Sequence, residues 1–436
     1  MLPARCAVMG ILVASARSAA FMSFFLVLVV VVASVHGYLW WRLVHDTRLP
    51  RAMERAATLA LVALFLAIPG TLVLWRLHSH SAPALVLCLG FGWLGVMFYM
   101  LTLVGSLDLS RGLFRLGAWL WPRRSQAAQA PEQAQAPQPA AQARLDAAEH
   151  TDGQTRRVFV ARALAGTAVA ASGGIAAFGV RSAFWDITMP EVAVRLPRLP
   201  KALDGYTIAL MTDIHIGPLL QGRFLRHLAE QVNSARPDLI AICGDLVDGS
   251  VEQIGVHVAE LRRMRARQGV CFVTGNHEYY SGAAPWCDFL TQLGVRVLMN
   301  ERIALGDAAV SGAQFDLVGV PDYRAGTAGG LAPDARAATR GRDEQRELVV
   351  LAHQPIQISD AARVGAGLQL SGHTHGRQLF PFGALVAAFA QPYLAGLHRH
   401  EATETQIYVS RGTGFWGPPM RVLAPAEITL LRLHSA

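Results

Sequence analysis

Long apolar stretches fill the first 180 residues of this chain, whereas short apolar runs alternate with polar segments after that point. Residues 20–41, 57–75 and 83–105 are each long enough to cross the roughly 30 Å hydrocarbon core of a bilayer as a helix. None of the three shows the polar face that a buried helix of a soluble domain presents. The pattern predicts a transmembrane helical region with three spans over residues 1–124.

A fourth apolar stretch, residues 158–180, is rich in Ala and Gly. It follows the pair Arg156-Arg157, which is typical both of a cytoplasmic stop before a membrane anchor and of a twin-arginine export signal. Residues 156–182 are therefore expected to be either a fourth transmembrane anchor or an export signal. Residues 125–155 begin as an Ala, Gln and Pro tract, and we expect a linker there because such a composition cannot bury a core.

The arginines beside these stretches predict how the chain crosses the membrane. They are frequent after the first and third spans, whereas the loop between the second and third spans holds only Arg76. Because cytoplasmic loops carry the excess of positive charge, the two arginine-rich regions are expected in the cytoplasm. A fourth span then leaves the remaining residues on the extracytoplasmic face of a multi-pass inner (plasma) membrane protein. The net charge of +8 is thus explained largely by topology, and no nucleic-acid partner is expected.

Residues 196–436 follow a different pattern, in which short apolar strands alternate with amphipathic helices. This alternation predicts an α/β fold, or more specifically a layered α-β-β-α domain. Residues 406–410 and 427–433 alternate in the β manner and are expected to close a second sheet. The other predicted strands are 206–211, 238–243, 270–274, 348–352 and 368–371, and the predicted helices are 221–235 and 254–266.

Polar side chains follow five of the predicted strands at the point where each strand ends. These side chains are carboxylates, imidazoles and one amide, which together suit a pair of divalent metal ions. Mixed nitrogen and oxygen ligation favours Mn, Fe or Zn. The five cysteines show no C-x-x-C spacing, which argues against a structural zinc ribbon. The predicted ligands are Asp213, His215, Asp245, Asn276, His353, His373 and His375.

The spacing also suggests how the ligands divide between two ions. Side chains two apart on an extended strand end point the same way, so Asp213 and His215 are expected to hold one ion together. Asp245 follows a glycine and is expected to bridge both ions with its two oxygens. Asn276 offers the second ion an oxygen without charge. The remaining imidazoles are assigned as His375 to the first ion and His353 and His373 to the second.

In this order, Asp-x-His, Gly-Asp-x-x-Asp, Gly-Asn-His-Glu, a lone His and Gly-His-x-His resemble the motifs of the calcineurin-like metallophosphoesterase family, over about residues 203–433. The longer endings 372–378 and 410–414, with the preceding membrane segments, are similar to its membrane-associated bacterial branch. The resemblance implies the same two ligand sets, with Asp245 shared. It also implies that His277 contacts the substrate phosphate or protonates the leaving group, which makes His277 and Asn276 the predicted catalytic residues.

Three further residues are candidates with two interpretations each. Arg377 stands where that branch often has a glycine, and it either contacts substrate phosphate or packs outward. Arg411 and Trp416 lie in a Gly-rich loop, where they either line the substrate cleft or close the fold. Asp248 is expected to support the loop or Asn276 rather than a metal.

The functional hypothesis is hydrolysis of a phosphoester by a hydroxide bridging two divalent metals. Membrane attachment and the apolar residues 379–389 suggest a lipid-linked or nucleotide-linked substrate of the cell envelope, and a soluble phosphoester is the alternative. A different class of protein, a membrane receptor or transport-associated protein that binds a phosphorylated ligand without turnover, stays open. A nuclease lacks the expected interleaved basic and aromatic residues. The sequence does not indicate the oligomeric state.

Overall fold

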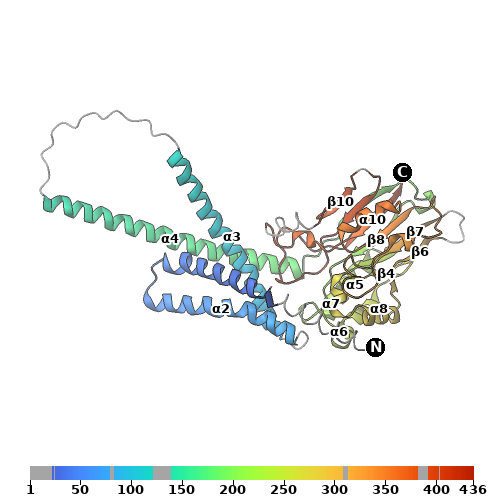
Figure 1. Cartoon of the computed structure of the whole chain (residues 1–436), viewed down its shortest axis with the longest axis horizontal. Coiled ribbons are helices and arrows are strands. Elements are labelled where there is room, and N and C mark those ends of the chain that lie inside the picture. The colour runs from blue at the N-terminus through green and yellow to red at the C-terminus, as the bar shows by residue number, and fades with distance from the viewer. Residues whose placement is uncertain are drawn as a thin grey trace, which may run out of the picture. The chain divides into compact units, whose positions relative to one another are not determined.

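The computed structural model describes residues 22–23, 25–78, 83–120, 139–307, 313–381, 391–401 and 403–436. The chain divides into two compact units (Figure 1). We call Met1–Val73 with Trp93–Ile175 the helical unit, and Leu74–Gly92 with Ala176–Ala436 the sheet unit. Each is described by itself.

Among the described residues, four helices are long and apolar enough to cross a membrane, and they include the three predicted spans and the fourth stretch. Their candidate spans are Phe25–His45, Arg51–Trp75, Ala84–Leu120 and Thr155–Phe184. The last lies in α4 (Pro139–Phe184), which begins inside the segment predicted as a linker; residues 125–138 lie outside the described residues. The other helices are α2 (Arg51–His78) and α3 (Ala84–Leu120), and the first ends in the π-helical turn η1 (Trp41–His45).

Polar side chains inside the helical unit are paired with one another. The Asp108 carboxylate accepts hydrogen bonds from Tyr38 Oη at 2.7 Å and from Arg42 Nε at 2.8 Å. Trp93 Nε1 donates to His36 Nε2 at 3.0 Å. Because an unpaired polar group in an apolar surrounding costs several kcal/mol, such pairs make these residues compatible with membrane-spanning helices.

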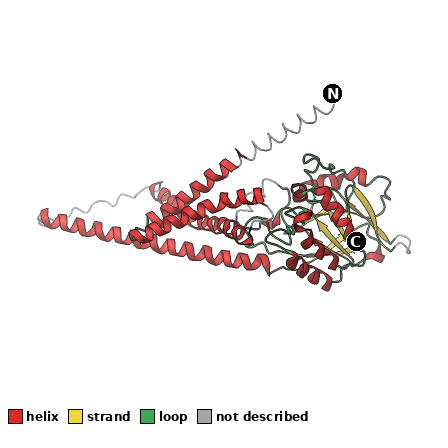
Figure 2. Cartoon of the chain, turned by 90° about the horizontal axis from the view of Figure 1, so that it is seen from below, coloured by secondary structure: helices red, strands yellow, loops and turns green. Residues whose placement is uncertain are grey.

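The sheet unit contains two six-stranded sheets, with strand orders β1-β12-β2-β3-β4-β5 and β10-β11-β9-β8-β7-β6. Figure 2 shows the strands in yellow with helices in red around them. The first sheet consists of β1 (Glu191–Leu196), β12 (Thr429–Ser435), β2 (Tyr206–Met211), β3 (Leu239–Cys243), β4 (Val270–Val273) and β5 (Arg296–Val297). The second consists of β10 (Gly396–Arg399), β11 (Gln406–Val409), β9 (Leu368–Ser371), β8 (Leu348–Leu351), β7 (Gln314–Gly319) and β6 (Glu301–Gly306).

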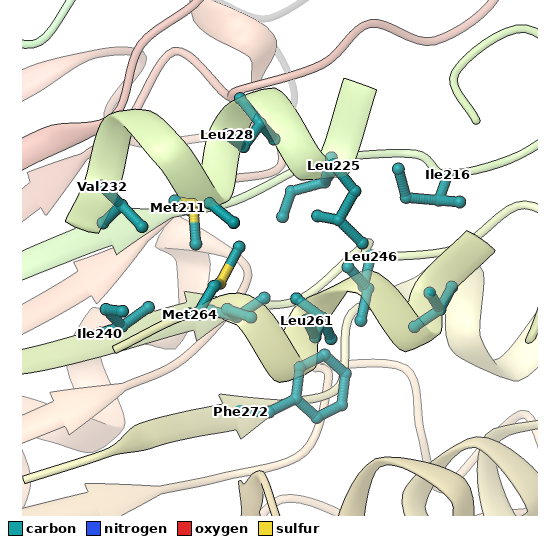
Figure 3. Close-up of a cluster of buried hydrophobic side chains, with 14 of the residues drawn as sticks. Met211, Ile216, Leu225, Leu228, Val232, Ile240, Leu246, Leu261, Met264 and Phe272 are labelled. Carbon is teal, nitrogen blue, oxygen red and sulfur yellow. The ribbon is translucent and has the colours of Figure 1, made fainter. Parts of the chain in front are cut away.

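Side-chain alternation along the strands builds the layers. In β2, Ile208 and Leu210 point into the core between the two sheets, whereas Ala209 and Met211 point to the outer helices. Figure 3 shows the outer core, where Met211 meets Leu228 of α5. The outer helices of the first sheet are α5 (Gly222–Ser234), α6 (Val251–Val258) with η3 (Ala259–Arg263), and α8 (Ala283–Gln292); those of the second are α9 (Ala335–Ala338) and α10 (Ile358–Arg363). The predicted α-β-β-α layering is therefore confirmed.

One predicted strand lies in another sheet than expected, and β1, β5, β6, β7 and β10 were not predicted. Residues 406–410 do join the second sheet as β11, but β12 lies in the first sheet, antiparallel to β2. The expectation that both segments close one sheet was wrong, because an alternating strand fits any sheet with one covered face and its partner is chosen by long-range contacts. On its other side β12 pairs with β1, so the first sheet begins upstream of residue 196.

The last turns of α4 are packed into the sheet unit. Ala183 is fully buried in the outer core, and the rings of Phe184 and Phe415 lie 5.0 Å apart. The backbone N–H of Arg421 donates to the Gly179 carbonyl at 2.8 Å. A Cβ atom at Gly179 would lie 2.9 Å from Met420 Cβ, so only glycine permits this approach. The helix therefore supports the loop that carries Arg421.

Candidate dinuclear metal site

The predicted ligands lie at the carboxyl ends of strands that run parallel to one another within each sheet. β2, β3 and β4 are parallel neighbours in the first sheet, and β8 and β9 are parallel neighbours in the second. Carboxyl ends of parallel strands share one edge, which is where α/β proteins hold ligands. Asp213 and His215 follow β2, Asp245 follows β3, Asn276 opens α7 (Asn276–Ser281) after β4, His353 follows β8, and His373 and His375 follow β9.

Asp213, His215 and His375 form the first cluster, and one ligand atom of each lies within 4.8 Å of the others. The two Nε2 atoms of His215 and His375 are 3.1 Å apart, and His375 Nε2 is 3.5 Å from Asp213 Oδ1. The two imidazoles are stacked at a centroid distance of 5.0 Å. Two nitrogens and a carboxylate oxygen facing one point suit a divalent cation.

Asp245, His353 and His373 form the second cluster. His353 Nε2 lies 3.2 Å from Asp245 Oδ2, and the rings of His353 and His373 are 5.2 Å apart. The buried Asn276 Oδ1 has no hydrogen-bond partner among the described residues, and His353 Nε2 lies close to the Asp245 carboxylate without forming a well-directed hydrogen bond with it. Because a buried polar atom without a partner is costly, Asn276 Oδ1 fits a place beside a bound cation.

His277 belongs to a third group, with His215 and Asp245. Its Nδ1 lies 2.6 Å from Asp248 Oδ1, and its Nε2 is turned toward Asp245 Oδ2 at 3.9 Å. Asp248 Oδ1 also lies 3.2 Å from His215 Nδ1. One carboxylate thus orients both imidazoles, so Asp248 supports His215 and His277, whereas support of the loop or of Asn276 was expected.

The backbone at the clusters is strained. Asp213, His215, Asp245 and His375 have φ of 51°, 52°, 51° and 51°, and His373 has φ of 71°. A non-glycine residue in this left-handed region costs about 1–3 kcal/mol, and such residues collect at functional sites. These conformations occur at ligand residues that follow β2, β3 and β9.

The side chain of Glu278 connects two of the ligand loops through hydrogen bonds. Its fully buried carboxylate accepts hydrogen bonds from four backbone N–H groups at 2.6 to 3.3 Å, those of Gly275, Asp245, Leu246 and Val247. Burial is the main cause that raises the pKa of Glu278, to about 7, with the nearby charge of Asp245 adding to it. The loops that carry Asp245 and Asn276 are therefore held at a fixed distance by one side chain.

Two glycines allow the loops to approach closely. A Cβ atom at Gly275 would lie 2.2 Å from Asp245 Oδ1, and one at Gly372 would lie 2.3 Å from Asp213 Oδ2. The carboxylate of Asp213 accepts the backbone N–H of His373 at 2.9 Å. The glycines before Asn276 and His373 are thus required by packing around the carboxylates.

Charges and burial tune the imidazoles in two directions. Burial lowers the pKa of His373 to about 4, helped by the nearby His353, and burial also holds the pKa of His375 well below its usual value. Neutral imidazole is the form that binds a metal. For His277, burial would lower the pKa, but the carboxylates of Asp248 and Asp245 outweigh it and raise the pKa to about 9. The two carboxylates therefore favour the protonated form of His277.

The two candidate arginines have different surroundings. Arg411 Nη1 pairs with the buried carboxylate of Glu427 at 2.7 Å, and its side chain lies against Gly376. Arg377 lines a cavity of about 510 Å³ with Phe380, Tyr393 and others. Of the apolar run 379–389, only residues 379–381 are among the described residues.

A third arginine, Arg421, was not a sequence-based candidate. It is fully buried, and its guanidinium donates to the carbonyls of Gly414, His375 and Ala424. Burial lowers its pKa to about 10. The one signal in the sequence is a lone charge between the apolar residues Met420 and Val422. Arg421 therefore supports the backbone of His375 through the hydrogen bond to its carbonyl.

Comparison with known proteins agrees with this geometry. Residues 206–377 match the family model described as calcineurin-like phosphoesterase. An uncharacterized metallophosphoesterase of Helicobacter pylori is 43% identical over 244 residues, which are 56% of this chain and 63% of that protein. A transmembrane protein with metallophosphoesterase domain of Bos taurus is 36% identical over 293 residues, which are 65% of this chain and 64% of that protein.

The chain covers less than two thirds of the length of these two relatives. Among solved structures, a dimetal phosphatase of Danio rerio is 13% identical, with a TM-score of 0.31 over 48% of this chain and 88% of that one, a likeness too low to carry weight. The family match, the order of the motifs and the relatives agree. Residues 206–377 of this chain are therefore a calcineurin-like phosphoesterase domain.

Proposed function

We propose that this protein is a phosphoric ester hydrolase that uses two divalent metal ions. The observation that carries the proposal is the placement of nitrogen and oxygen atoms from five strand ends in neighbouring clusters. The first ion would be held by Asp213, His215, Asp245 and His375, and the second by Asp245, Asn276, His353 and His373. When bound, the ions lower the pKa of a water molecule and neutralise charge on phosphoryl oxygens.

The residues of the chain supply the proton and the orientation. With Nδ1 held by Asp248 at 2.6 Å, His277 keeps Nε2 on the side of the clusters. A protonated Nε2 in that place would donate to the leaving oxygen of a phosphoester, which is general acid catalysis. Water would attack the phosphorus atom directly, in line with the leaving group. The proposed reaction therefore includes no covalent intermediate with the protein.

His277→Ala is expected to lower kcat by about 10²–10³-fold, because proton donation to the leaving group is lost. The full-length protein, purified in detergent, would be assayed with Mn, Zn and Fe on a panel of phosphomonoesters and phosphodiesters. Metal content measured in parallel should stay near wild type in His277→Ala and fall in Asn276→Ala. His227→Ala, which changes an exposed histidine of α5, is the control.

If the wild type binds metal but turns over no member of the panel, the binding-only alternative replaces the proposal. If it turns over the panel and both variants match it, the roles of His277 and Asn276 are wrong. Lipid extracts and nucleotide-linked lipids belong in the panel, because the substrate we propose is a lipid-linked or nucleotide-linked phosphoester of the cell envelope.

The membrane topology gives a separate prediction. With four spans and arginine-rich regions on the cytoplasmic side, the sheet unit is expected on the extracytoplasmic face of the inner membrane. A reporter enzyme that is active only outside the cytoplasm, fused after Ala436, should be active. A fluorescent reporter that matures only in the cytoplasm should be dark at the same position, and the reverse pattern would invert the topology.

A further inference from the structure

Two exposed aromatic side chains flank His277. The ring of Tyr280 lies 5.2 Å from the imidazole, and the indole of Trp416 lies 5.7 Å from it, both nearly edge-on. Their exposed fractions are 72% and 51%. Tyr280 comes from α7, whereas Trp416 comes from the loop between β11 and β12, more than a hundred residues away. Two distant segments therefore place aromatic surface beside one histidine.

The loop of Trp416 is fixed in place. Gln378 receives the backbone N–H of Trp416 on Oε1 at 3.1 Å and donates Nε2 to the carbonyls of Trp416 at 2.9 Å and Pro418 at 3.0 Å. Gln378 lies three residues after His375, on the same loop as two predicted ligands. A side-chain amide that uses both its oxygen and its nitrogen on one loop sets the position of that loop closely.

The start of the same loop is fastened to the first cluster. Thr413 N–H donates to the Thr212 carbonyl at 2.8 Å, and Gly414 N–H donates to the Asp213 carbonyl at 2.9 Å. A Cβ atom at Gly414 would lie 2.1 Å from the Ile214 carbonyl oxygen. The exposed indole is thus anchored to the ligand loops on both sides, and its position relative to His277 follows from theirs.

We infer that Trp416 and Tyr280 form the leaving-group subsite and select phosphoesters whose leaving group has an aromatic or other planar apolar surface next to the ester oxygen. The inference rests on the proposed function. An ester oxygen within hydrogen-bond reach of His277 Nε2 brings the atoms attached to it alongside the two rings. Edge and face contacts between rings at 4.5–7 Å are favourable beyond the area that they bury. Gln378 is the positioning residue for Trp416.

The test compares an aryl phosphate with glycerol phosphate in the full-length protein with metal. In Trp416→Ala, kcat/KM for the aryl substrate is expected to fall about tenfold more than kcat/KM for glycerol phosphate, mainly through KM. Trp416→Phe should restore most of this preference. Val256→Ala, which changes an exposed apolar residue of α6, should alter neither substrate.

Gln378→Ala should reduce the same preference, and the double variant with Trp416→Ala should be no worse than Trp416→Ala alone, because both changes act through one ring. Equal losses for the two substrates in Trp416→Ala, or additive losses in the double variant, would overturn the inference while leaving the hydrolase proposal intact. If the wild type hydrolyses neither substrate nor any other phosphoester, the proposed function fails and the inference fails with it.

Discussion

Asp245→Asn is expected to lower turnover by about 10³-fold or more and to reduce bound metal below two ions per chain. Asp245 belongs to two of the three ligand groups found among the described residues. Its Oδ2 lies 3.2 Å from His353 Nε2, and its Oδ1 accepts the backbone N–H of His277 at 2.9 Å. The amide keeps the shape and an acceptor for that N–H. It removes the negative charge that two cations would share.

Metal content by mass spectrometry and turnover on the best substrate of the panel measure this prediction. Asp288→Asn, an exposed position on α8, is the matched control and should change neither quantity. The opposite outcome, two bound ions and turnover within threefold of the wild type, would mean that Asp245 does not bridge the clusters.

The second large effect is on stability. Glu278→Ala leaves four buried backbone N–H groups without their acceptor, and each unsatisfied group costs about 1–3 kcal/mol. We expect a loss of about 4 kcal/mol or more, since water entering the space offsets part of the sum. For a folded unit of this size that corresponds to a fall of about 8 °C or more in apparent Tm.

Thermal unfolding of the purified protein measures the loss. Glu278→Gln should fall between the wild type and Glu278→Ala, because one side-chain oxygen still accepts hydrogen bonds. Glu230→Ala on the exposed side of α5 serves as the control and should stay within about 1 °C. An apparent Tm of Glu278→Ala within 2 °C of the wild type would show that the two loops are held by other contacts.

The strands that carry ligands were predictable because they are buried on both faces. Such strands read as continuous apolar runs, and β2 and β3 were placed within one residue of their ends. β1 was missed, because charged residues interrupt the apolar run in Glu191–Leu196. Its partner β12 is also the last strand of the chain, so no nearby segment indicates the pairing. The sheet that β12 joins depends on that long-range pairing, which local pattern does not contain.

The site divides in the same way. The predicted ligands follow strand ends and could be read from residue type and spacing. Asp248, Glu278 and Arg421 act by orienting other groups, and their roles depend on partners from other loops. Glu278 was recognised in the sequence as part of Gly-Asn-His-Glu. The sequence does not show that its carboxylate accepts hydrogen bonds from four backbone N–H groups. Trp416 was recognised as a candidate, but the sequence left open whether it lines the substrate cleft or closes the fold. Its neighbour His277 comes from a distant segment, so local pattern could not show the contact.

The contacts of the end of α4 determine where this protein can be truncated or joined to another in a chimera. Gly179 and Arg421 share a backbone hydrogen bond, and the Arg421 guanidinium reaches the carbonyl of His375. A fragment that starts at residue 196 would lack the end of α4 and most of β1. The sheet unit therefore includes the end of α4 from about residue 176. A soluble version should retain the chain from about residue 176, and a chimera that exchanges only the upstream helices should join inside α4.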